Sequence, residues 1–192
     1  MHTEAFATLL QSGRAGDPAA LGEIWRTYAP AVTAYLRGKG AEEPEELTSE
    51  TFLALFRALP EFRGDEAGLK ALLFTIARRR LVDEVRRRGR RVATVTWERH
   101  LDERTAPSAE ETAVGQLGSV EARALLQRLA PDQRDVLMLR IFGDLTIDQI
   151  AEILDKRQGA VKQLQRRGLE SLRRLLAAQR TTHHDRTEEV TP

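Results

Sequence analysis

The chain of 192 residues carries a formal net charge of +1, is 41% apolar and contains no cysteine. This length and apolar fraction fit one medium-sized domain or two small ones with ordinary hydrophobic cores, and the lack of cysteine excludes disulfides and cysteine nucleophiles. No stretch approaches the roughly 18 consecutive apolar residues of a membrane span, and polar residues interrupt any signal-peptide core, so we expect a cytoplasmic protein without membrane insertion.

The first strongly predicted helix begins at Asp17-Pro18, a pair typical of a helix N-terminus. Apolar side chains recur at helical spacing from Leu21 to Tyr35. The sequence Gly38-Lys39-Gly40 then predicts the end of this helix.

The segment from Ala41 to Glu66 is strongly acidic and contains the second predicted helix. This helix begins near Pro44, carries a broad apolar stripe and ends at Pro60. On its outer face, an exposed leucine among carboxylates is suited to contact with a helix of a partner protein. The alternative is that this is an ordinary solvent-exposed face. The residues of that outer face are Glu46, Glu50, Leu53 and Arg57.

A long third helix is predicted after a loop at 64–68 and ends at Gly89. Its arginine-rich side favours binding to phosphates through counterion release and stacking on unpaired bases. The alternative to DNA binding is that this side of the helix is an ordinary solvent-exposed face, in a protein that uses arginine more often than lysine. The arginines are Arg78, Arg79, Arg80, Arg86, Arg87 and Arg88.

Residues from about 90 to 107 lack a helical stripe and end in Thr-Ala-Pro-Ser, which predicts a linker. Ser108 and Glu111 resemble a capping box for the next helix. The tail after Ala178 holds one large apolar residue, Val190, so we expect it to be flexible. The prediction is an all-α protein with small helical domains at 1–91 and 108–178, an extended linker at 92–107 and a tail at 179–192.

The second half shows the spacing of a helix-turn-helix. Thr146-Ile147-Asp148-Gln149 has the form of a capping box, and Asp155 supplies a turn residue that tolerates the left-handed conformation. Lys156 occupies a position where such turns usually bury an apolar residue, and its stem can lie along apolar surface. An ordinary helical hairpin with a solvated face is the alternative. The outward residues suited to phosphates and major-groove base edges are Lys162, Gln163, Gln165, Arg166 and Arg167.

Taken together, these segments resemble the extracytoplasmic-function group of the sigma-70 family, whose members have only sigma domains 2 and 4. The resemblance spans about 17–176. In the first half it is carried by Glu46-Leu47-Thr48-Ser49-Glu50-Thr51-Phe52, Glu61-Phe62-Arg63-Gly64, Thr75-Ile76-Ala77-Arg78 and Leu81-Val82-Asp83. In the second half it is carried by Leu129-Ala130-Pro131, Arg134-Asp135-Val136-Leu137 and Gly159-Ala160-Val161-Lys162.

The resemblance implies an RNA polymerase sigma factor that is not an enzyme and has no cofactor or metal of its own. The implied partners are core RNA polymerase, through its β′ coiled coil and β flap, promoter DNA and an anti-sigma factor. The implied residues for core polymerase are Glu46, Leu47, Ser49, Glu50 and Leu53. Those for the minus-10 element are Phe62, Arg63, Lys70, Arg78, Arg79, Arg80, Arg86 and Arg87. Those for the minus-35 element are Arg157, Lys162, Gln163, Arg166 and Arg167.

Certain positions depart from the family's pattern. Ser49 stands where the family often has Gln, Leu72 where Trp is common, and Arg79 where Asn is common. The resemblance implies that the loop from Phe62 to Leu72 captures a flipped base of the non-template strand. Because Leu72 and Arg79 lie in or near this loop, the sequence does not specify which minus-10 base is preferred. The promoter sequence and the activating signal are not specified by these residues either.

Alternative functions remain for this sequence. A stand-alone helix-turn-helix regulator would bind DNA without polymerase, usually as a dimer, with the first half as a sensing or dimerising module. A metal enzyme using His183-His184 is a third reading, although no third ligand is positioned beside them.

Overall fold

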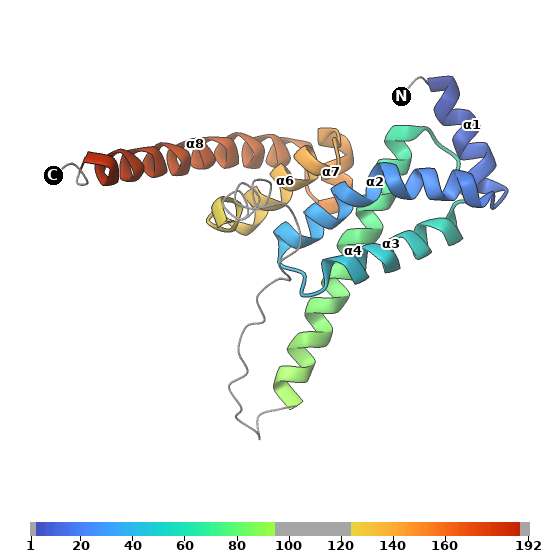
Figure 1. The fold of residues 1–192 in the computed structure, drawn as a ribbon, viewed down its shortest axis with the longest axis horizontal. Coiled ribbons are helices and arrows are strands. Elements are labelled where there is room, and N and C mark those ends of the chain that lie inside the picture. The colour runs from blue at the N-terminus through green and yellow to red at the C-terminus, as the bar shows by residue number, and fades with distance from the viewer. Residues whose placement is uncertain (1–2, 95–123, 189–192) are drawn as a thin grey trace.

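The computed structural model describes residues 3–94 and 124–188, and all their regular structure is helical. The predicted all-α class is therefore confirmed. The first half contains α1 (Thr3–Arg14), α2 (Pro18–Lys39), α3 (Pro44–Ala58) and α4 (Glu66–Thr94) (Figure 1). The second half contains α6 (Pro131–Phe142), α7 (Ile147–Leu154) and α8 (Gln158–Glu188). The predicted linker beyond Thr94 and the capping box at Ser108 lie outside the described residues.

Helix α2 begins and ends where the sequence predicts. The carboxylate of Asp17 accepts hydrogen bonds from the backbone N–H groups of Ala19 and Ala20, both at 3.3 Å. Gly40 ends the helix in the left-handed conformation, with φ 87°, which a residue without Cβ adopts at little cost. Both ends of α2 are therefore set by local chemistry.

The core of the first half lies where α2, α3 and α4 pack on one another. The rings of Trp25 and Phe52 lie 4.6 Å apart between centroids, and those of Tyr35 and Phe74 lie 5.4 Å apart in an edge-to-face arrangement. These aromatic pairs join α2 to α3 and α2 to α4, so they fix the position of the arginine-rich helix α4 relative to the acidic helix α3.

Helix α1 was not predicted. Phe6, Leu9 and Leu10 are buried, and Gly13 is so close to α3 that an added Cβ would lie 3.0 Å from Leu59 Cδ2. These residues have the i, i+3, i+4, i+7 spacing of a helix, but one of the inward positions is a glycine and gives no apolar signal.

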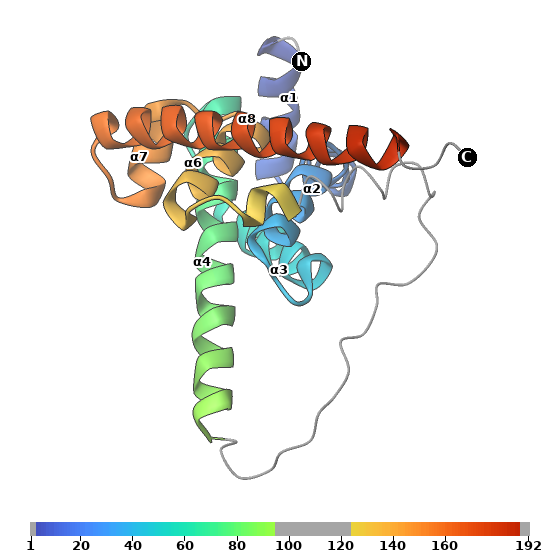
Figure 2. The ribbon, with the colours of Figure 1, turned by 90° about the vertical axis from the view of Figure 1, so that its left-hand side faces the viewer.

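The ends of α4 and α8 differ from the prediction. Helix α4 continues past Gly89 to Thr94, and α8 continues past Ala178 to Glu188, into the segment predicted as a flexible tail. In both views these ends project away from the packed body (Figures 1 and 2). An α-helix satisfies its backbone hydrogen bonds internally, so it can continue where no apolar stripe remains, and a helical glycine costs only about 1 kcal/mol.

The two halves also pack against each other. Helix α6 lies on α2 and α7 lies on α4, and the buried side chains of both halves belong to one continuous cluster (Figure 2). Among the helices of the described ranges, none is both long and apolar enough to cross a membrane.

Candidate nucleic-acid interface

The turn between α7 and α8 has the geometry that the sequence predicts. Thr146 Oγ1 accepts the backbone N–H of Gln149 at 3.3 Å, and Gln149 Oε1 accepts the backbone N–H of Thr146 at 2.9 Å. At the other end of α7, Asp155 has φ 52° and ψ 50°, the left-handed conformation. The capping box and the turn residue are therefore both confirmed.

Lys156 follows the turn and is partly buried. Its Nζ lies 3.0 Å from Asp132 Oδ2 of α6, and its side chain is 30% exposed. Most of the Lys156 side chain is thus shielded from solvent, while its ammonium group has a carboxylate partner.

The first turns of α8, called here the recognition helix, are held by small and apolar residues on the inner face. Val161 is fully buried, and Gly168 lies so close to α6 that an added Cβ would be 3.0 Å from Leu137 Cδ1. Gln165, expected to face outward, is only partly exposed. All of the predicted minus-35 residues are exposed: Arg157, Lys162, Gln163, Arg166 and Arg167.

The exposed side chains of the recognition helix form a basic surface with few internal partners. Arg157, Gln163 and Arg167 line a cavity of about 330 Å³ beside the Lys156–Asp132 pair. Arg166 Nε lies 3.9 Å from a carboxylate oxygen of Glu170, a weak contact between exposed groups. These guanidinium and amide groups are therefore available to phosphates and base edges.

Helix α4 presents its arginines on two kinds of surface. Arg79 and Arg87 are exposed, and Arg86 is exposed beside Asp83 at 3.8 Å. Arg80 Nη1 lies 3.7 Å from Glu50 Oε2 of α3, and Arg78 is half-buried. The outer arginines can bind a polyanion directly, whereas Arg80 would first leave its carboxylate partner.

The loop before α4 is shaped by Phe62. Its ring lies over Gly64 and Gly68, and a Cβ on Gly64 would be 2.6 Å from Phe62 Cζ. Arg63 is exposed and donates to the carbonyl of Pro60 at 2.7 Å. Lys70, in the first turns of α4, lies 3.3 Å from Glu66 and 3.7 Å from Asp144 of the second half. A side chain at position 64 would therefore require the Phe62 ring to move.

The outer face of α3 has an exposed apolar residue among charged ones. Leu53 is 56% exposed, Glu46 and Ser49 are exposed, and Glu50 is partly exposed. The Glu43 carboxylate accepts a hydrogen bond from the protonated carboxyl of Glu46 and, together with its charge, raises the pKa of Glu46 above its usual value. Leu47 corrects the predicted set, because it is only 4% exposed: it belongs to the apolar stripe and supports the helix from inside.

The contacts between the two halves were missed by the sequence interpretation. Lys39 at the end of α2 forms a mostly buried ion pair with Asp135 of α6, and the side-chain amide of Gln149 donates to the carbonyl of Ala67 at 2.9 Å. These residues are far apart in the sequence and share no motif, so no local pattern could have paired them. No cluster of three or more His, Asp or Glu side chains that could hold a metal ion occurs among the residues whose side chains the structure describes, and His183 and His184 lie outside that set.

Comparisons with known proteins agree with this arrangement. The family model described as sigma-70 region 2 matches residues 24–91, and the model described as sigma-70 region 4 matches residues 125–174. The chain is 31% identical over 170 residues to the ECF RNA polymerase sigma factor BldN of Streptomyces coelicolor, with 88% of this chain and 64% of BldN covered. It is 30% identical over 181 residues to the ECF sigma factor SigD of Mycobacterium tuberculosis, with 90% of this chain and 84% of SigD covered.

Solved structures support the fold. CnrH in complex with the cytosolic domain of CnrY gives a TM-score of 0.64 at 21% identity, covering 91% of this chain and 98% of that one. RpoE from Bartonella quintana in complex with the anti-sigma factor NepR gives 0.63 at 23% identity, covering 81% and 96%. At these identities the likeness concerns the arrangement of helices.

Proposed function

The chain belongs to the extracytoplasmic-function group of the sigma-70 family of RNA polymerase sigma factors, and from that premise we propose that it recruits core polymerase to specific promoters and assists in melting them. The observation that carries the proposal is the pairing of two basic surfaces on one chain. One is the exposed recognition helix of the second half, and the other is the arginine-rich side of α4. We place the functional units at residues 1–91 and 108–178.

The recognition helix would bind the minus-35 element in the major groove. Lys162, Gln163 and Arg166 carry the donors and acceptors that suit guanine and adenine edges, and the exposed Arg157 and Arg167 would contact phosphates. The capped turn and the buried Val161 hold this helix in one orientation on its domain. Such support is what base-specific contacts need.

The minus-10 element would be bound by α4 and the loop before it. Arg79, Arg86 and Arg87 are exposed and can hold the backbone of the non-template strand. A flipped base would be captured near Phe62, Arg63 and Lys70. Binding the unpaired state better than the duplex lowers the free energy of melting, since a ligand shifts an equilibrium by its differential affinity.

The outer face of α3 would dock on the β′ coiled coil of core polymerase. Leu53 gives an exposed apolar contact, while Glu46, Ser49 and Glu50 give the polar rim around it. The second half would rest on the β flap. The chain would have no catalytic activity of its own and would act in the cytoplasm.

An anti-sigma factor is a further proposed partner. CnrH and RpoE, whose helices are arranged as in this chain, were each determined in complex with another protein, the cytosolic domain of CnrY and the anti-sigma factor NepR. A comparable protein would regulate this chain by competing for the surfaces that bind core polymerase.

Run-off transcription tests the proposal. Purified core polymerase and a library of promoter fragments are incubated with the protein, with Leu53→Asp, or with neither. Transcripts that appear only with the unaltered protein, and enriched fragments that share two elements, are expected. Specific DNA binding by the protein alone, without core binding or transcripts, would instead identify a stand-alone regulator.

A further inference from the structure

A cavity of about 330 Å³ lies between the first turns of the recognition helix and the start of α6. Its lining includes the cationic side chains of Lys156, Arg157 and Arg167 and a single carboxylate, that of Asp132. Gln163, which is assigned above to base edges, lines the same cavity. The cavity therefore adjoins the proposed DNA-binding face and carries an excess of positive charge.

Lys156 is the unusual member of this lining. The turn of a helix-turn-helix usually buries an apolar residue at its position, whereas the Nζ of Lys156 lies 3.0 Å from Asp132 Oδ2. An ammonium group has three N–H donors, so it can keep a hydrogen bond to Asp132 and still donate to a second acceptor. Its side chain is 30% exposed and lines the cavity, so a ligand there can reach the ammonium group.

Asp132 is the one carboxylate that an anion in this cavity would meet. Its side chain is 58% exposed, so its charge is not enclosed by the Lys156 contact. An anion would be repelled by this carboxylate and would share Lys156 with it. Asparagine at this position has the same size and still offers Lys156 an oxygen acceptor, so Asp132→Asn removes the repulsion and little else.

We propose that the cavity seats a backbone phosphate of the minus-35 duplex, with Lys156 as a DNA-contacting residue and Asp132 as the group that limits its affinity. The phosphates that border a major groove flank any helix inserted in it, and the cavity lies along one flank of the recognition helix. Phosphate contacts carry no base identity, so this seat adds affinity without sequence preference. That the phosphate belongs to DNA rests on the proposed function.

Single substitutions at the ion pair test the phosphate seat. Lys156→Met supplies an unbranched apolar side chain of the kind usual at this position and removes only the charge. Lys156→Arg keeps the charge. Glu152→Gln, at an exposed position of α7 outside the cavity, controls for the loss of one negative charge elsewhere on the second half. Circular dichroism and thermal unfolding check that each variant is folded.

Binding is measured by fluorescence anisotropy of the holoenzyme on duplexes with the preferred and with a scrambled minus-35 sequence, over a range of salt concentrations. Lys156→Met should weaken binding roughly three- to tenfold on both duplexes and lower the slope of log affinity against log salt by about one, because one phosphate contact is lost. Lys156→Arg should keep the slope. Asp132→Asn should strengthen binding roughly threefold, and more than Glu152→Gln does.

Lysine acetylation gives a second readout that does not depend on affinity. The chain has four lysines, Lys39, Lys70, Lys156 and Lys162, so mass spectrometry can follow each one separately. Promoter DNA added to the holoenzyme should protect Lys156 and Lys162, with the mostly buried Lys39 as the internal reference. Inorganic phosphate at the same ionic strength should not protect Lys156. Protection by inorganic phosphate alone would mean that the cavity binds a free anion and would overturn the assignment to DNA.

The remaining outcomes separate this inference from the proposed function. While the parent holoenzyme still binds promoters, the phosphate seat is overturned by an unchanged salt slope in Lys156→Met or by an unprotected Lys156 beside a protected Lys162. Equal gains in Asp132→Asn and Glu152→Gln would overturn the role of Asp132. A parent holoenzyme that binds no fragment and yields no transcript would overturn the proposed function, and the DNA phosphate with it.

Discussion

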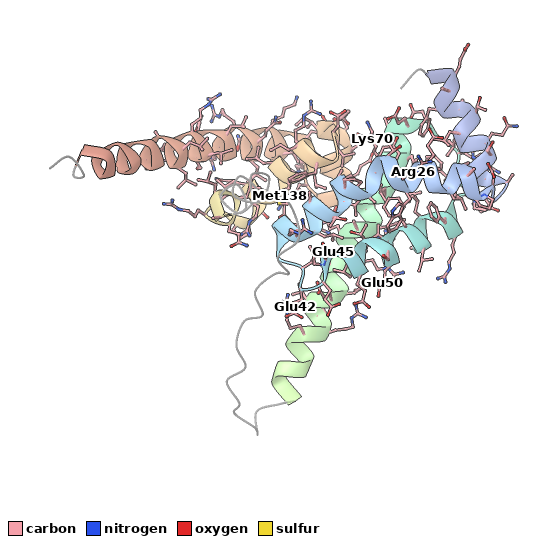
Figure 3. All side chains as sticks on the ribbon, in the orientation of Figure 1. Arg26, Glu42, Glu45, Glu50, Lys70 and Met138 are labelled. Atoms are coloured by element: carbon pink, nitrogen blue, oxygen red, sulfur yellow. The ribbon has the colours of Figure 1, made fainter. Side chains whose placement is uncertain are left out.

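Met138 packs end-on against Gly38, so that a Cβ built on Gly38 would lie 2.4 Å from Met138 Cε. Real Cβ atoms do not approach another heavy atom so closely, so a side chain at position 38 would require the terminal methyl group of Met138 to move. Met138 belongs to the second half of the chain and Gly38 to the first. The Met138 side chain is fully buried at this contact (Figure 3). One side chain thus joins two units that the family models match separately.

We predict that the recognition helix reads bases through Lys162 and Arg166. Either residue changed to Ala should weaken binding of the holoenzyme to its preferred minus-35 sequence by about 1–3 kcal/mol, because a bidentate contact to a base edge is lost. Arg174→Ala, an exposed arginine farther along α8, is the control and should change affinity little. Affinities on matched and scrambled minus-35 fragments separate the effects: an equal loss on both would indicate phosphate contacts.

Glu50 and Leu53 should both contribute to binding of core polymerase. Glu50→Lys reverses a charge on the outer face of α3, and it also removes the contact with Arg80 at 3.7 Å. The swap Glu50→Lys/Arg80→Glu restores an opposite-charge pair within the chain and should leave core binding weak. Recovery of core affinity in the swap would mean that Glu50 acts by positioning α4. Glu45→Lys, on the side of α3 that faces Arg37, is a matched charge control.

Asp155 should tolerate Gly or Asn but not Val. Its φ of 52° is strained for a β-branched residue, so Asp155→Val should destabilise the second half by about 1–2 kcal/mol. Urea unfolding followed by circular dichroism gives the free energy of unfolding. Glu152→Val, an exposed helical position in α7, is the control, with an expected loss of a few tenths of a kcal/mol. Equal losses at the two positions would contradict the importance of the left-handed turn.

The free energy of unfolding should fall at alkaline pH because of Tyr28 and Tyr35. Burial raises the pKa of both phenols above the ordinary value of 10.0; the hydrogen bond and charge of Glu66 add to the effect at Tyr28, and the charge of Asp135 adds to it at Tyr35. The native chain therefore binds more protons than the unfolded chain above about pH 10, and stability decreases with rising pH there. Below pH 10 this contribution is fully present.

Phenylalanine at these positions isolates the tyrosine contribution. Tyr35→Phe should flatten the alkaline decline in the free energy of unfolding measured by urea titrations at several pH values. Tyr28→Phe should flatten it too, while losing about 1 kcal/mol at neutral pH with the hydrogen bond of 3.1 Å to Glu66. An unchanged slope in the double variant would show that other groups control the alkaline transition.

Local signals in the sequence were sufficient for most elements of the fold. The Asp17 cap, the Gly40 end and the Thr146–Gln149 capping box each depend on residues a few positions apart, and the structure confirms all of them. The exposed minus-35 residues follow from the same periodicity, since burying Val161 turns its neighbours outward. Leu47 shows the limit of a motif, because a residue in a matching stretch can belong to the core.

The sequence by itself determined the helical class, the capped turn of the helix-turn-helix and the separation of acidic and basic segments, because helix periodicity, caps and charge are local properties. Only the tertiary structure decided that α1 folds onto α2, that Lys39 meets Asp135 and that α7 faces Leu72 and Arg79 across a cavity. These contacts join residues far apart in the chain, and their free energy depends on shape and charge that become complementary only after the helices have formed.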